Sequence, residues 1–174
     1  AKLTAFDDRT EQLLETLMVA TDGSGRLSQP GTEHRWGLEL EGGLQWGDWQ
    51  ARWSGHRMQG RTFDGLKERP LLTVPADRLQ LSLGWRQGWG ELGLRWQQVW
   101  ARTYFKDNTR TTTGRQPSHR LIGAWAQWRV NETFTLDLAA ENLANETYRL
   151  DNGFASEGVE GPGRNLRVAL SARY

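Results

Sequence analysis

Hydrophobic and polar residues alternate along most of the chain beyond about residue 33. In segment 78–86, leucine or tryptophan fills every odd position, and Gln, Ser, Gly or Arg fills every even one. Successive side chains of a β-strand point to opposite faces, so this period of two predicts strands with one apolar and one polar face. The same alternation recurs in segments 36–41, 49–54, 91–96, 122–130, 134–141 and 163–174. The chain is therefore predicted to be all-β and antiparallel.

The alternation is irregular in a few places. Its exceptions within the predicted strands are Gln98 on the apolar side, and Leu121 and Trp125 on the polar side. Near the N-terminus, Lys2–Phe6 predicts the end of a strand, and Asp7–Thr10 predicts a short turn. The apolar stretch Glu11–Ala20 fits either a strand or a short amphipathic helix, because its leucines match both periods.

Short and long connections alternate between the predicted strands. The short ones are Asp7–Thr10, Gly47–Asp48, Gln87–Gly90 and Asn131–Glu132, and the long ones are about Thr21–Thr32, Thr62–Asp77, Lys106–Ser118 and Glu146–Pro162. Outer-membrane barrels have tight turns on one rim and long loops on the other, whereas soluble sandwiches do not sort their connections in this way. Strands of roughly 9–13 residues also suit a tilted crossing of a bilayer. The pattern thus favours a transmembrane β-barrel with about nine strands in this chain.

Composition and charge exclude several classes of protein and of functional site. The net charge is +1, from 22 Lys+Arg and 21 Asp+Glu, which argues against a nucleic-acid-binding surface. The chain has no cysteine, so disulfides, thiolate catalysis and Cys-bearing zinc sites are excluded. Its mean hydropathy is −0.72 and it has no apolar run of about 18 residues, which excludes a transmembrane helix but not transmembrane strands. No signal peptide precedes the first segment, so we interpret the chain as a mature form or an internal piece.

Aromatic residues gather near the predicted short turns. The chain contains 10 tryptophans. The aromatics at this end are Trp46, Trp49, Trp85, Trp89, Trp128 and the terminal Tyr174. Rings with a polar N–H or O–H favour the headgroup level of a membrane, so we expect these six to form a membrane girdle. The alternative is that they fill a soluble core.

The polar face carries many charges. They are Glu39, Glu41, Arg52, Arg86, Glu91, Arg95, Arg129, Asp137, Glu141, Arg167 and Arg173. The interior of an eight-stranded barrel is just wide enough for packed side chains, and buried ions are costly unless they are well paired. Single-chain bacterial barrels also usually have an even number of strands. Both arguments favour a wider barrel of which this chain forms only a part.

Four segments carry a resemblance to a known family. Asn142–Tyr148 reads Asn-Leu-Ala-Asn-Glu-Thr-Tyr and resembles the Asn-Leu-Phe-Asp-x-x-Tyr element near the end of TonB-dependent outer-membrane receptors. Segment 163–174 resembles that family's last strand, which ends in an aromatic residue. Val74–Leu79 is similar to its Val-Pro-x-x-Arg-Leu strand entry, and Gly37–Glu41 to its Gly-x-Glu-x-Glu strand. The order and spacing of all four match the last nine strands of a 22-stranded barrel.

The resemblance implies a fold and a function. Residues 1–174 would be the C-terminal part of a single barrel domain, and the family's plug domain and TonB box would be absent from this chain. The whole receptor would import a scarce nutrient, such as a ferric siderophore, haem or cobalamin, with energy delivered through TonB. The departures are Ala144 for the usual Phe and Asn145 for the usual Asp, and the second puts the hydrogen bonding of the local loop in question.

The expected partners follow from the same resemblance. They are outer-membrane lipid and lipopolysaccharide, the plug and the remaining barrel strands, the TonB system, and an iron chelate or haem as transported ligand. No nucleic acid, resident cofactor or metal is expected. We expect the lumen wall that holds or pairs with the plug to consist of Glu39, Glu41, Arg52, Arg86, Arg95, Arg129, Asp137 and Arg173. The loops expected to shape the ligand vestibule are 23–30, 62–75, 103–117 and 150–162.

Three histidines are candidate ligand-binding residues. His34, His56 and His119 fall toward the long-loop side, where an imidazole could ligate haem iron; the alternative is that they are ordinary polar wall residues. Basic loop residues could attract anionic chelates or lipopolysaccharide phosphates, or could simply be solvated; they are Arg26, Lys67, Arg69, Lys106, Arg110 and Arg115.

Catalysis is not expected. Ser54 and His56 lie two residues apart on one face, but no activating motif accompanies them, so we predict that the chain is not an enzyme. Two further alternatives stay open. One is a small closed outer-membrane barrel of eight to ten strands with a structural or adhesive role. The other is a soluble lipocalin-like barrel with its apolar faces turned inward.

Overall fold

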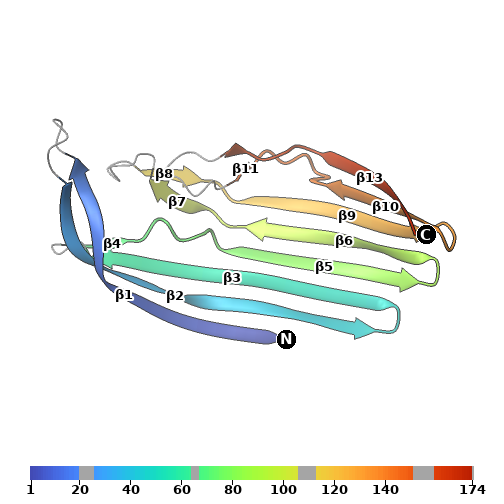
Figure 1. Cartoon of the computed structure of the whole chain (residues 1–174), viewed down its shortest axis with the longest axis horizontal. Coiled ribbons are helices and arrows are strands. Elements are labelled where there is room, and N and C mark those ends of the chain that lie inside the picture. The colour runs from blue at the N-terminus through green and yellow to red at the C-terminus, as the bar shows by residue number, and fades with distance from the viewer. Residues whose placement is uncertain (20–25, 64–66, 106–112, 151–158, 174) are drawn as a thin grey trace.

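The main element of the fold is one curved antiparallel β-sheet (Figure 1). The computed structural model describes residues 1–19, 26–63, 67–105, 113–150 and 159–173. Eight strands follow one another across the sheet: β1 (Lys2–Val19), β2 (Arg26–Trp46), β3 (Trp49–Phe63), β5 (Arg78–Gln87), β6 (Gly90–Val99), β9 (His119–Arg129), β10 (Phe134–Glu141) and β13 (Asn165–Ala172). A ninth, β4 (Glu68–Pro70), pairs with the far end of β3. The all-β antiparallel prediction is confirmed.

Two small ribbons extend the sheet at its long-loop end. Strand β7 (Arg102–Phe105) pairs with β8 (Thr113–Gln116), and β11 (Arg149–Leu150) pairs with β12 (Val159–Glu160). Over the described residues, no helix is long and apolar enough to cross a membrane.

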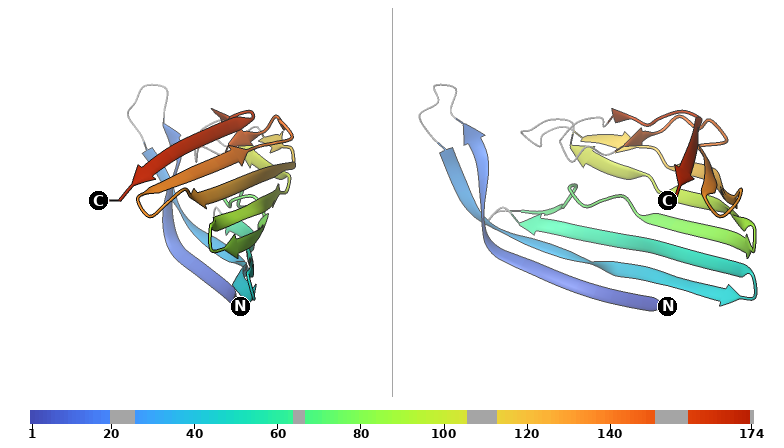
Figure 2. Two further views of the ribbon diagram at one scale, coloured as in Figure 1. Left: turned by 90° about the vertical axis from the view of Figure 1, so that its right-hand side faces the viewer. Right: turned by 45° about the vertical axis from the view of Figure 1, so that its right-hand side comes forward.

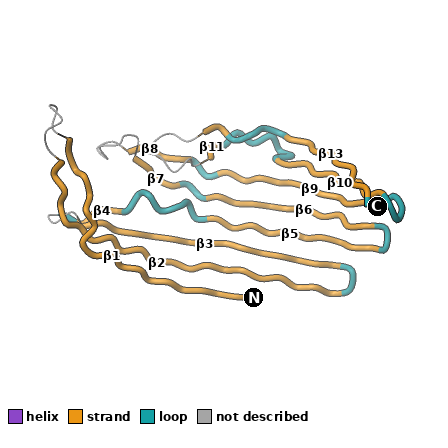
Figure 3. The backbone as a smooth tube through the Cα atoms, viewed as in Figure 1, coloured by secondary structure: helices purple, strands orange, loops and turns teal. Residues whose placement is uncertain are grey.

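The alternation of short and long connections is confirmed within the described strands. The links β2–β3, β5–β6 and β9–β10 are tight and lie at one end of the sheet, whereas β3–β5, β6–β9 and β10–β13 are long and lie at the other (Figure 3). Gly47 adopts φ 54° in the first tight turn, a left-handed conformation that glycine accepts without strain. A backbone hydrogen bond connects this turn to the end of β5, since the amide of Arg86 donates to the carbonyl of Asp48 at 2.8 Å.

The N-terminal region differs from the sequence-based prediction. The turn predicted at Asp7–Thr10 does not form, because β1 is continuous and Asp7 through Thr10 pair with Trp36 through Glu33 of β2. The helix considered for Glu11–Ala20 does not form either, since the chain is strand to Val19. The long loop predicted for Thr21–Thr32 is shorter, because β2 already begins at Arg26. The backbone hydrogen bonds between β1 and β2 stabilise a strand here despite the turn-like composition of the sequence. Register shifts at Thr10/Leu13 and Thr16/Met18 accommodate the irregular hydrophobic pattern of β1.

The sheet has almost no core of its own. Among the side chains whose burial the structure describes, only Leu71 and Tyr148 are buried hydrophobic ones, and both belong to long connections. The sheet is also open, since β1 pairs only with β2 and β13 only with β10 along the strand order (Figure 2). An open sheet does not correspond to the closed small barrel or to the closed lipocalin-like barrel considered from the sequence.

Asn142 organises the long connection after β10. This residue is 4 % exposed and has φ 50°. Its side-chain amide donates to the carbonyls of Glu146 (2.9 Å) and Pro162 (3.1 Å), while its Oδ1 accepts from the Glu146 amide (2.8 Å). One side chain thus joins both ends of the connection, since Pro162 leads into β13.

Asn145 supplies the hydrogen bond that the sequence had put in question. It adopts φ 54°, and its Oδ1 accepts from the backbone amide of Arg164 at 3.0 Å. An amide oxygen accepts this bond as a carboxylate oxygen would, so the Asn145 departure leaves the loop intact.

Replacing Asn142 by alanine is expected to lower the free energy of unfolding by about 2–4 kcal/mol. The change leaves two backbone carbonyls and one amide without a partner and places alanine at a positive φ. The measurement is urea unfolding in detergent. The matched variant Asn145→Asp retains an acceptor oxygen and should stay within about 0.5 kcal/mol of the parent; equal effects of the two changes would contradict this account.

Candidate functional site

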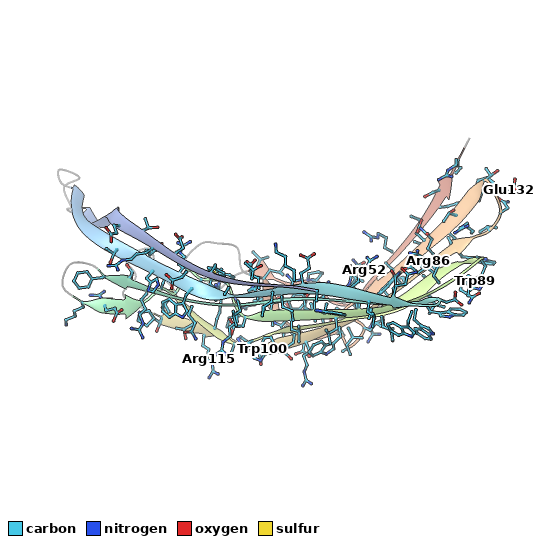
Figure 4. The ribbon with its side chains drawn as sticks, turned by 90° about the horizontal axis from the view of Figure 1, so that it is seen from below. Arg52, Arg86, Trp89, Trp100, Arg115 and Glu132 are labelled. Atoms are coloured by element: carbon cyan, nitrogen blue, oxygen red, sulfur yellow. The ribbon has the colours of Figure 1, made fainter. Side chains whose placement is uncertain are left out.

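The two faces of the sheet differ in curvature and in chemistry. Seen edge-on, the sheet is a trough, with Arg52 and Arg86 on the concave side and Trp100 on the convex side (Figure 4). Strand register places all eleven charges of the predicted polar face on the side of Arg52 and Arg86. The concave surface is therefore the candidate functional site.

Glu91 is the centre of a polar network on the concave face. Arg86 donates to its Oε2 through Nε (3.0 Å) and Nη2 (2.7 Å). Gln50 and Trp125 donate to its Oε1, at 2.6 Å and 3.3 Å. Arg52 then donates to Gln50 Oε1 at 3.2 Å. Four neighbouring strands are thereby joined by side chains, and the negative charge of Glu91 is already compensated within the wall.

Trp125 lies flat over glycines of the neighbouring strands. A Cβ added at Gly93 would lie 2.3 Å from Cζ2 of Trp125, and one at Gly84 would lie 3.4 Å from the same atom. The guanidinium of Arg95 lies 5.8 Å from the centre of the indole ring. Trp125, which departs from the alternation of hydrophobic and polar residues, thus fits on the polar face because the neighbouring glycines have no side chains. Its indole N–H is directed to Glu91.

A groove of about 240 Å³ opens beside Trp125 on the concave face. Small residues, Gly123 and Ala139, lie on its floor, and Arg95, Arg167 and Glu141 line its sides. Tyr148 lines its long-loop end. Burial raises the pKa of the Tyr148 phenol above its ordinary value, and the Glu141 carboxylate acts in the same direction, so the hydroxyl stays protonated and able to donate.

The remaining lumen candidates lie elsewhere on the concave face. Glu39 and Glu41 are in β2, opposite His56 and Ser54 of β3. Asp137 accepts from Gln127 at 2.8 Å. Arg129 lies at the end of β9, and the Arg173 amide donates to the carbonyl of Thr133 at 2.9 Å. The structure thus brings the eight predicted lumen residues onto one face, without joining them in a single cluster.

The three histidines are in separate environments. His34 Nε2 lies 2.9 Å from Asp7 Oδ2, and His56 Nε2 lies 3.0 Å from the carbonyl oxygen of Ala76. His119 is 7 % exposed and packs against Tyr148, with 4.8 Å between ring centres and a 32° tilt between the ring planes. Over the described residues, no group of three His, Asp or Glu residues is placed to hold a metal ion.

The convex face forms an uncharged band. From the short-turn end upward, the first charged convex positions in the described strands are Asp7 on β1, Arg57 on β3 and Arg120 on β9. On β3 the band extends from Trp49 to Arg57, eight residues or roughly 26 Å along the strand at ~3.3 Å per residue. Large apolar side chains are exposed throughout it; Leu81, Leu94, Ile122 and Val168 are 41–60 % exposed.

Four of the predicted girdle residues form a continuous row. Ring centres are separated by 6.5 Å between Trp46 and Trp49, 6.5 Å between Trp49 and Trp85, and 5.8 Å between Trp85 and Trp89. Trp89 lies at the short-turn end of the trough (Figure 4). Trp128 lies on the same convex side, opposite Gly90, and is 52 % exposed. Tyr174 lies outside the described residues.

Sequence reasoning missed how the long connections are anchored. Asp77 precedes β5; its side chain accepts from the Met58 amide at 3.2 Å and lies 3.6 Å from Arg57 Nε. Its carbonyl accepts from the Trp100 amide at 2.9 Å. The Val-Pro-x-x-Arg-Leu segment was the signal available, but periodicity alone does not indicate which strands such a segment joins. The predicted vestibule segments lie partly outside the described residues.

Replacing Gly93 by alanine is expected to destabilise the protein by about 1–3 kcal/mol, because the new methyl group overlaps the Trp125 ring. The indole should also leave Glu91, which will shift the fluorescence of Trp125 in a variant that retains this tryptophan alone. Gly88→Ala is the matched control, since a Cβ there meets nothing within 4 Å. A fully stable Gly93→Ala protein with unchanged Trp125 emission would contradict the packing described.

Comparisons with known proteins agree with this geometry. A family model described as TonB dependent receptor-like, beta-barrel, matches residues 1–143. No curated protein sequence matches the chain. Among solved structures, the chain is similar to the ferripyoverdine receptor of the outer membrane of Pseudomonas aeruginosa, with 18 % identity and a TM-score of 0.76.

Two further structures are similar: the FrpB iron transporter from Neisseria meningitidis, with 17 % identity and a TM-score of 0.76, and the copper transporter OprC, with 18 % identity and a TM-score of 0.72. These three matches cover 97 %, 97 % and 98 % of this chain, but 24 %, 28 % and 29 % of the respective neighbours. The chain therefore spans only about a quarter of the length of these receptors and transporters.

Proposed function

The chain belongs to the TonB-dependent receptor-like β-barrel family, and from this premise we propose that it forms part of the wall of an outer-membrane receptor importing a scarce nutrient. Receptors of this family are outer-membrane β-barrels, and they are transporters rather than enzymes. The observation that carries the proposal is the two-faced trough, with charges on its concave side and an uncharged band on its convex side. Lipid would cover the convex side of such a wall, and a polar lumen would lie on the other.

The concave residues would contact a domain that fills the lumen. In this proposal, the residues that hold or pair with such a plug are Glu39, Glu41, Arg52, Arg86, Arg95, Arg129, Asp137 and Arg173. Arg86 is already paired with Glu91, so its contribution would be to stiffen the wall. The plug, the remaining strands and the contact with TonB would belong to the longer receptor.

The tryptophan row would mark one membrane interface. Amphipathic rings at the headgroup level fix the height of a barrel in the bilayer. The girdle would comprise Trp46, Trp49, Trp85, Trp89, Trp128 and Tyr174, and outer-membrane lipid and lipopolysaccharide would be its surroundings.

The transported substrate would be a metal chelate, most simply a ferric siderophore. The similar structures are a ferripyoverdine receptor, an iron transporter and a copper transporter, which supports a metal-containing substrate. Haem remains within the proposal, with His34, His56 and His119 as candidate ligands near the vestibule. Strand register places His34 on the convex side, where Asp7 engages it, whereas His56 and His119 lie on the concave side and are engaged by Ala76 and Tyr148.

Replacing Leu81 by arginine is expected to destabilise the receptor by about 2–4 kcal/mol in lipid, because Leu81 lies opposite Trp53 and Trp96 in the middle of the convex band. Urea unfolding in phospholipid vesicles measures this. The control is Gln80→Arg on the neighbouring concave position, which should cost less than about 1 kcal/mol. A larger cost at Gln80 than at Leu81 would reverse the assignment of the two faces.

The intact mass of the polypeptide isolated from outer membranes tests the proposal directly. Since the chain covers about a quarter of its structural neighbours, a mass near ~70–80 kDa is expected. A mass near 19.9 kDa would overturn the receptor proposal and favour a small self-contained barrel.

A further inference from the structure

The two ends of the convex band are chemically different. At the short-turn end, the convex side has the tryptophan row and no charged residue in the described strands. At the long-loop end, the first charged residues above the band are Asp7 on β1, which contacts His34, and Arg57 and Arg120 on β3 and β9; Trp100 lies between the two arginines in chain order. We call Arg57, Trp100 and Arg120 the boundary patch. A membrane whose two leaflets had identical headgroups would give no reason for this difference.

The boundary patch is held in place by Asp77. The Asp77 carboxylate lies 3.6 Å from Arg57 Nε and accepts from the Met58 amide, while its carbonyl accepts from the Trp100 amide. Arg57 still keeps 71 % of its side chain exposed, and Trp100 is 44 % exposed. The arginine and the indole are therefore positioned by one residue, yet both remain available to a partner on the convex side.

Arg120 is the second cation of the patch. It is exposed and stands opposite Gln98, and it forms no ion pair with any residue in the described part of the chain. Trp100 and Arg115 both lie on the convex side (Figure 4), so the cationic character continues away from the band. Asp77 is the only acid in contact with the patch among the described residues, and it cannot compensate both arginines.

The position and spacing of the patch define its partner. Arg57 and Arg120 are separated across the sheet by three strand spacings, from β3 across β5 and β6 to β9, or roughly 14 Å at ~4.8 Å each, and register offsets them by two residues along the strands. Guanidinium groups bind phosphate in bidentate fashion, and an indole favours the headgroup level. A headgroup with a phosphate at each end can place one phosphate beside each arginine across that distance.

We propose that the boundary patch binds a bisphosphorylated glycolipid of the outer leaflet, with Arg57 and Arg120 each engaging one phosphate and Trp100 packing against the sugar between them. The proposal rests on the proposed function only in that the convex face meets lipid. It also orients the wall, because the long loops must then face the phosphorylated leaflet.

The test compares lipid A bearing two phosphates with lipid A bearing one, added to the full-length receptor in neutral detergent micelles. Affinity is measured by native mass spectrometry. The wild-type protein should bind the bisphosphorylated form roughly fivefold more tightly. Arg57→Gln and Arg120→Gln should each bind the two forms equally, while Arg120→Lys should retain part of the preference. Arg35→Gln, which removes a charge from the concave face at the same end, should behave like the wild type.

Absence of a preference in the wild-type protein would overturn the proposal without any variant, and so would a full preference in both glutamine variants. These results are distinct from failure of the proposed function. A polypeptide mass of 19.9 kDa together with a preference for the bisphosphorylated lipid would contradict the proposed receptor function but support the lipid-binding site. A receptor-sized mass without the preference would do the reverse.

Discussion

Backbone hydrogen bonding between neighbouring strands is the interaction on which this structure depends. A globular domain is held together mainly by a buried apolar core, but among the side chains whose burial the structure describes, only Leu71 and Tyr148 are buried hydrophobic ones. The ladders from β1 to β13 therefore fix the shape, and each strand is positioned by its neighbours along the chain. In a medium without water, unpaired backbone groups are especially costly, so such a ladder is the natural solution for a membrane wall.

The absence of a core explains why both faces are chemically specialised. The convex face presents apolar side chains that no part of the described sheet covers, and the concave face satisfies its own polar groups locally. Glu91 is the clearest case, because Arg86, Gln50 and Trp125 all donate to it. The same residues thereby join neighbouring strands and compensate the charge of Glu91, and Arg95 and Arg167 beside the groove form no ion pair among the described residues.

Local periodicity was sufficient to predict the faces, the antiparallel arrangement and the alternation of connections, since side-chain direction depends only on position along a strand. Periodicity failed where the local structure depends on residues that are distant in the sequence. Asp7–Thr10 has the composition of a turn, but the facing strand β2 continues past it and supplies hydrogen-bond partners. Trp125 looked misplaced because the glycines that accommodate it, Gly84 and Gly93, lie on other strands. The roles of Asn142 and Asp77 were equally hidden, because each joins segments that are brought together only by folding.

The tryptophan row has an optical consequence. Indole rings separated by 5.8–6.5 Å are close enough to exchange excitation energy before they emit. Excitation energy absorbed by Trp46 therefore reaches other members of the row, and its polarisation is lost mainly at the tilted contacts, where the rings are inclined by 47° and 61°. The row spans β2, β3 and the β5–β6 turn, so depolarised emission requires that these strands already lie side by side. The rim thus carries an intrinsic spectroscopic signal of its own assembly, with no added dye.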